Sequence, residues 1–307
     1  MISAQRPIIP PAFIQARVSA AINKTLGSNF NLHEPHGEPA LVGADSVSWR
    51  VFKNAVALLV GGIAAVILEL AEPKVRAGVW DHTSFRKNPG NRLRRTGLAA
   101  MITVYGPRAE AEKMIANVRR MHERVRGTAE NGEEYYANDP ELLDWVQATA
   151  GFGFLQAYHR FVRPLTRADR DRYYGEGIGA SALYGATSIQ GTEASLQAYF
   201  LSMEPRLGPS PVIHEFLDIM EQAEILPAIL RPVQRLLIRA GVELVPQDLR
   251  EKLQIQNRGL RLGEETLVKF IGRLSDRIVL RESPAVQACE RLGLPADYLY
   301  QPASRRA

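Results

Sequence analysis

Residues 69–127 read ELAEPKVRAGVWDHTSFRKNPGNRLRRTGLAAMITVYGPRAEAEKMIANVRRMHERVRG, and two segments of this stretch decide the fold. In the second segment, residues 107–127, apolar side chains recur at steps of three and four: Ala111, Met114, Val118, Met121 and Val125. This spacing places them on one face of a helix, with His122 at the edge of that face. Pro107 suits the first turn of such a helix and Gly127 suits its end. We therefore predict a helix over 107–127 that directs His122 into or along a core.

The first segment, residues 91–106, predicts a second helix with an unusually bare face. Its small residues are Gly97, Ala99, Ala100 and Thr103. Protein interiors are packed as densely as organic crystals, so a bare face needs something broad laid against it. That partner is either a neighbouring helix or a flat cofactor.

The rest of the chain follows the same helical period, so we predict an all-α fold. Alternating strand patterns of useful length are absent, and Asn131-Gly132 predicts one small β-hairpin. We expect a single globular domain with an N-terminal arm and short helix (1–42), a core (43–255) and C-terminal helices packed on that core (256–307). Further helices are expected over 139–162, 166–178, 191–204, 210–222, 226–240, 246–254, 263–278 and 284–292.

Composition narrows the class of protein. The 307 residues are 46% hydrophobic and 23% charged, which is ordinary for a globular chain. A net charge of +5, without basic runs interleaved with aromatic residues, argues against nucleic acid as a partner. The apolar run 55–68 falls short of the ~20 residues that span a bilayer, so we expect a buried core helix and no stable membrane span. Gly61 and Gly62 within it indicate close approach by another backbone or by a ligand ring.

The single cysteine, Cys289, excludes an internal disulfide and a cysteine-rich metal site. The N-terminus lacks a basic region followed by an apolar core and a cleavage site. We therefore expect a cytoplasmic protein.

Several motifs, taken together, are similar to those of a known family. The runs EPKVRAGVWDHTSFRKNPGNRLRRT, RRMHERVRGT, DPELLDWVQATAGFGFLQAYHRFV and LTRADRDRYYGE occur in matching order over roughly residues 43–250. They resemble the family of latex-clearing rubber oxygenases and MpaB-type oxygenases. The resemblance implies an all-α fold around one b-type haem, with a proximal histidine and a distal R-x-x-K-T motif.

Carried over residue by residue, the proximal ligand falls on His122 and the distal motif on Arg92, Arg95 and Thr96. Arg95 departs from the rubber oxygenases, which have lysine there. A guanidinium stays protonated and is a poor metal ligand, so we expect water or an open sixth site. Gln147 also departs, because many relatives carry histidine at that position.

Haem needs an axial donor, cations for its propionates and an apolar slot. His122 can supply the donor, and Arg119 and Arg126 are candidate propionate partners, with Arg92, Arg120 and Arg124 as further cations. Gly97 and Ala100 can form the slot. His82, at a predicted helix end, stays open as a rival iron ligand or as a contact of the cofactor edge. Apart from the resemblance, a lone histidine on an amphipathic helix is more often a core or surface residue.

The leading hypothesis is a haem-dependent oxygenase that uses dioxygen on an apolar, alkene-like small molecule, with an unknown electron donor. Rubber oxygenases act outside the cell, so we do not expect polyisoprene as the substrate. Two alternatives remain: a non-catalytic haem carrier or sensor, and a cofactor-free helical interaction protein. Paired E-x-x-H motifs, G-x-S-x-G and H-E-x-x-H are absent, which argues against di-iron, serine-hydrolase and zinc-protease chemistry.

Overall fold

The computed structural model describes residues 7–13, 15, 31–82, 85–86 and 88–301. This part of the chain is mostly helical, with one small two-stranded antiparallel sheet, so the all-α prediction is confirmed. The helix expected within residues 1–42 lies largely outside the described residues.

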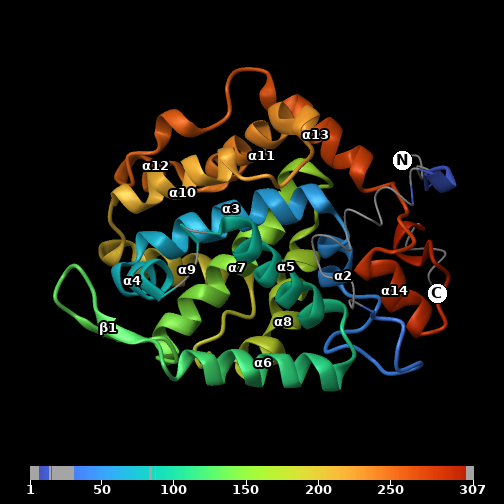
Figure 1. Ribbon diagram of the computed structural model, residues 1–307, viewed down its shortest axis with the longest axis horizontal. Helices are drawn as coiled ribbons and strands as arrows, with labels where there is room; N and C mark the ends of the chain where they lie inside the picture. The colour runs from blue at the N-terminus through green and yellow to red at the C-terminus, as the bar shows by residue number, and fades with distance from the viewer. Residues whose placement is uncertain (1–6, 14, 16–30, 83–84, 87, 302–307) are drawn as a thin grey trace.

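The elements follow one another along the chain as a succession of helices interrupted by one hairpin (Figure 1). In order they are α2 (Val47–Phe52), α3 (Ala55–Ala71), α4 (Pro73–His82), α5 (Pro89–Tyr105), α6 (Arg108–His122), β1 (Arg126–Thr128), β2 (Glu134–Tyr136), α7 (Pro140–Phe161), α8 (Arg167–Tyr184), α9 (Glu193–Met203), α10 (Pro211–Gln222), α11 (Arg231–Leu244), α12 (Gln247–Lys252), α13 (Glu264–Ser275) and α14 (Pro284–Arg291). Short 3-10 turns lie at Glu204–Arg206, Ala228–Leu230, Gln256–Arg258 and Tyr298–Tyr300.

Helices α3 and α7 form the centre of the molecule. Asn54 caps α3 by accepting from the Ala57 amide at 3.0 Å, and Asp139 caps α7 ahead of Pro140. The two backbones touch, because a Cβ on Gly61 would stand 2.7 Å from the carbonyl oxygen of Gly153. We expected either another backbone or a ligand ring to approach Gly61, and the structure shows that a backbone does. In Figure 1, α10 to α13 lie on one side of this pair and α6 and α8 on the other.

A sharp bend separates α3 from α4. Pro73 begins α4, and the Glu72 carboxylate accepts from the Val75 amide at 2.7 Å, which stabilises the new first turn. Among the described residues, a single helix with the length and apolarity to cross a membrane is not found. Helices α3 and α4 pass that test only as a pair, and they are bent by 109°.

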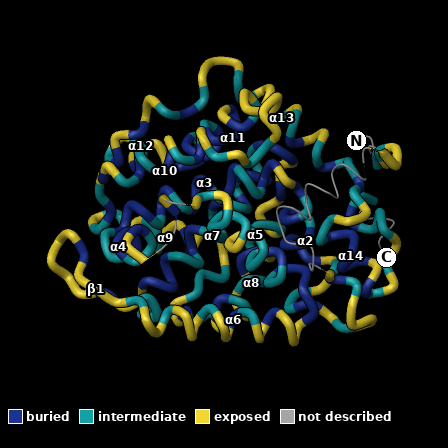
Figure 2. The backbone as a smooth tube through the Cα atoms, viewed as in Figure 1, coloured by how far each residue is buried: buried dark blue, intermediate teal, exposed yellow. Residues whose placement is uncertain are grey.

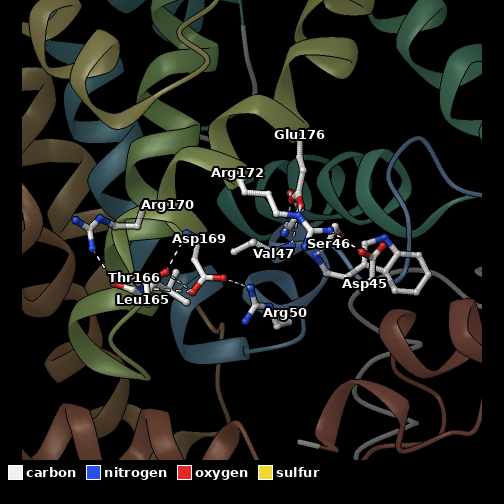
Figure 3. A network of polar contacts seen from close by, with 12 residues as sticks. Asp45, Ser46, Val47, Arg50, Leu165, Thr166, Asp169, Arg170, Arg172 and Glu176 are labelled. Atoms are coloured by element: carbon white, nitrogen blue, oxygen red, sulfur yellow. Dashed lines mark hydrogen bonds and ion pairs between the residues drawn. The ribbon is translucent and has the colours of Figure 1, made fainter. Parts of the chain in front are cut away.

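A polar network fixes α8 against α2 (Figure 3). The Glu176 carboxylate accepts from the Val47 amide at 3.0 Å, and Arg172 bonds the same carboxylate at 2.9 Å. One helical turn along α2, Arg50 pairs with Asp169 at 2.7 Å. These contacts fix the position of α8 beside the region between the central helices and α6.

Several element boundaries differ from the predictions, and α8 continues past its predicted end at residue 178 to Tyr184. Helix α6 ends at His122 instead of continuing to residue 127, because the chain turns into β1 of the predicted hairpin, whose Gly132 has φ 83°. Helix α11 spans residues 231–244 instead of 226–240, because Ala228–Leu230 form a 3-10 turn and Pro232 lies in the first turn of the helix. The hairpin itself is confirmed.

Candidate functional site

One face of the central helix α3 is only half-buried, although most of the helix is enclosed. The half-buried residues recur at steps of four, four and three: Leu58, Gly62, Val66 and Glu69. A matching half-buried face runs along α7 through Val146, Gln147, Ala150, Gly151 and Phe154. Helix α5 is half-buried along most of its length (Figure 2). Accessible space therefore reaches the two innermost helices.

Two glycines of the outer helices have open space beside them. A Cβ placed on Gly97 of α5 or on Gly177 of α8 would have no atom within 4 Å. The bare face predicted on α5 is thus left uncovered at Gly97, while Thr103 further along contacts the Tyr184 hydroxyl of α8 at 3.1 Å. Ala100 of the same face is half-buried and packs against the core.

Three charged or titratable groups from three helices act on one another in this region. They are Glu69 of α3, Arg92 of α5 and His122 of α6. Burial raises the pKa of Glu69 to about 7, against the opposing effect of the Arg92 charge. Burial likewise lowers the pKa of Arg92, and the negative charge of Glu69 raises it. The pKa of His122 is lowered first by burial and then by the Arg92 charge, while contact with Asn138 raises it.

Glu69 was missed by the sequence reasoning. Its carboxylate has no hydrogen bond or ion pair within the described part of the chain, yet its side chain keeps some accessible surface. Burial without a hydrogen-bond partner is what raises the pKa of this carboxyl group. One feature of the sequence could have identified it: Glu69 is the one charged residue in the apolar run from residue 54 to residue 71.

His122 is the last residue of α6 and is half-buried. Its Nδ1 atom is fully enclosed and forms no hydrogen bond of normal geometry. Its Nε2 atom is not enclosed in this way and also lacks a partner among the described residues. Lowering of the pKa favours the neutral imidazole, which is the state that binds a metal. Nε2 is therefore the atom available to a ligand.

The distal-motif residues lie at different depths. Arg92 is half-buried near His122, whereas Arg95 and Thr96 are exposed. The Arg95 guanidinium reaches the Met121 sulfur at 3.8 Å and so lies beside the end of α6. Gln147, on the half-buried face of α7, accepts from the Ser181 hydroxyl at 3.3 Å.

The predicted propionate partners Arg119 and Arg126 are both exposed. A Cβ on Gly185, at the end of α8, would stand 3.6 Å from Nε of Arg119. Arg126 lies over the Tyr136 ring at 5.6 Å and donates to the Glu123 carbonyl at 3.1 Å. Their role toward a propionate stays a prediction.

His82 lies at the exposed end of α4. Its Nε2 is 2.9 Å from the Tyr135 hydroxyl, so this ring already has a partner. Among the described residues, groups of three or more His, Cys, Asp or Glu that could hold a metal ion are not found.

The comparisons with known proteins identify one family. A family model described as "ER-bound oxygenase mpaB/B'/Rubber oxygenase, catalytic domain" matches residues 49–273. The match confirms the resemblance and extends it beyond residue 250 into α13. Neither a curated protein nor a solved structure matches the chain.

Proposed function

The chain belongs to the MpaB and rubber oxygenase family, and from this premise we propose that it is a haem-b-dependent oxygenase of an apolar, unsaturated small molecule. Membership in the family implies an oxygenase, and with it a substrate and dioxygen. The observation that carries the finer proposal is the state of His122. One of its ring nitrogens is enclosed, the other is not and has no partner among the described residues, and Gly97 of α5 has open space beside it.

The residues present fit a b-type haem. Nε2 of His122 would hold the iron, Gly97 and Ala100 would line the slot, and Arg92, a half-buried cation whose charge acts on His122, would pair with a propionate or hydrogen-bond a ligand. When bound, haem supplies the dioxygen chemistry that side chains cannot.

The protein's own groups would set the surroundings of that chemistry. Leu58, Val66 and Phe154 give the space apolar walls, which favour an apolar substrate and exclude water. Arg92 would donate hydrogen bonds from its guanidinium. Glu69, whose pKa is raised to about 7, is half protonated near neutral pH and can hold or release a proton at its carboxyl oxygens. Arg95 and Thr96 would restrain ligands nearer the surface.

Haem titration of the purified protein tests the cofactor. We expect a Soret band in the wild type, its loss in His122→Ala, and its retention in the control His82→Ala. Loss in His82→Ala with retention in His122→Ala would transfer the ligand role to His82. A wild-type protein that takes up no haem would refute the proposal.

Oxygen uptake tests turnover. The haem-loaded protein with apolar alkenes and a reductant should consume dioxygen, and Glu69→Gln should slow this consumption while leaving haem bound. Binding of haem without any dioxygen consumption would instead favour the carrier or sensor alternative.

A further inference from the structure

Asn138 lies between β2 and α7, beside the last turn of α6. Its Nδ2 donates to the carbonyl oxygen of Arg119 at 2.9 Å and lies 3.4 Å from the Tyr136 hydroxyl. The same carbonyl accepts from the Glu123 amide at 3.2 Å, so the Asn138 contact adds a second hydrogen bond at the end of α6. It also fixes which way the amide faces, because only the nitrogen can donate to a carbonyl.

The other end of this amide meets His122. Oδ1 of Asn138 is fully buried and has no hydrogen bond of normal geometry, and the same holds for Nδ1 of His122. The Asn138 side chain lies within hydrogen-bonding reach of the imidazole, and this contact raises the pKa of His122 against the effects of burial and of the Arg92 charge. A buried acceptor and a buried ring nitrogen left unpaired would both be unfavourable.

We propose that Asn138 is the positioning residue of His122, with Oδ1 accepting a hydrogen bond from Nδ1–H. This bond selects the neutral tautomer that carries its proton on Nδ1 and leaves Nε2 free for iron. It also fixes the plane of the ring. The iron-binding consequence rests on the proposed function, whereas the tautomer does not.

Two substitutions separate this role from a merely structural one. Asn138→Asp keeps an oxygen acceptor toward His122 and loses the N–H donor to Arg119. Asn138→Leu has a similar size and loses both. If Asn138 only stabilises the end of α6, the two variants behave alike. If it positions His122, aspartate retains the function and leucine does not. Circular dichroism and thermal unfolding establish that each variant folds.

The haem-free readout is the nitrogen NMR of the His122 ring. We expect the Nδ1–H tautomer in the wild type and in Asn138→Asp, and a shift toward the Nε2–H tautomer in Asn138→Leu. An Nε2–H tautomer in the wild type, or identical ring spectra for wild type and Asn138→Leu, would overturn the proposal. This result stands whether or not haem binds.

The haem-dependent readouts are the haem dissociation constant and the iron–histidine stretching frequency of the ferrous protein. Loss of such an outer partner typically weakens metal binding about 10- to 100-fold, and we expect this for Asn138→Leu together with a lower frequency. Asn138→Asp should bind haem within a few-fold of wild type and raise the frequency, because a carboxylate attracts the Nδ1 proton more strongly. Equal losses in both variants would contradict the positioning role. A wild type that binds no haem would refute the proposed function alone.

Discussion

Replacing Glu69 with glutamine removes an ionisable group that the fold keeps protonated at pH values above the range in which a carboxyl group ordinarily titrates. Burial raises the pKa of Glu69 from 4.5 to about 7. Each pKa unit corresponds to about 1.4 kcal/mol, so the full difference is worth about 3 kcal/mol. Below pH 4.5 both the folded and the unfolded chain carry the proton, and Glu69 contributes nothing to pH dependence.

Between pH 4.5 and 7 the folded protein holds a proton that the unfolded chain has released. Stability therefore falls as pH rises through this window, and the full penalty remains above pH 7. Glutamine cannot ionise, so Glu69→Gln should gain stability relative to wild type as pH rises. Roughly 2.5 kcal/mol of the gain should appear between pH 5 and pH 9.

Equilibrium urea unfolding of the purified proteins at intervals from pH 5 to pH 9 measures this gain. The matched control is Glu112→Gln on α6, whose carboxylate is 47% exposed and lies 3.7 Å from Arg108. Its free energy of unfolding should stay within about 0.5 kcal/mol of wild type at every pH. A Glu69→Gln profile that runs parallel to wild type would refute the reasoning, because Glu69 would then titrate as an ordinary carboxyl group.

Two further predictions concern the helix contacts around the site. Gly61→Ala should destabilise the protein by about 1–3 kcal/mol, since its Cβ would stand 2.7 Å from the Gly153 oxygen. The control Gly179→Ala in α8, where the added Cβ would have no atom within 4 Å, should be neutral or stabilising by up to about 1 kcal/mol. Thermal unfolding compares the two variants. Equal effects of the two substitutions would contradict the α3–α7 backbone contact. Arg92→Gln should raise the pKa of His122 in an NMR titration, because the Arg92 charge lowers it. The control Arg94→Gln should leave the pKa of His122 unchanged. An unchanged pKa of His122 in Arg92→Gln would show that the Arg92 charge on α5 does not act on this imidazole.

The local structure of this chain was determined by the sequence. Asp139 and Thr166 cap helices at the expected positions, and Asn131-Gly132 turns the expected hairpin. These features depend on hydrogen bonds within a few residues and on a 3.6-residue apolar period, so they can be predicted without knowledge of the fold. Ordered motifs along the chain also indicated the family, which the match over residues 49–273 confirmed.

Tertiary structure alone decided which groups share the site. Glu69, Arg92 and His122 come from three helices, and the sequence does not show how those helices are rotated against one another. The pairing of Gly61 with Gly153, the placement of Asn138 beside His122 and the exposure of Arg126 depend on the same packing. Burial and the field of neighbouring charges are sums over everything that surrounds a group. The nearly neutral pKa of Glu69 and the enclosed nitrogen of His122 therefore exist only in the folded chain.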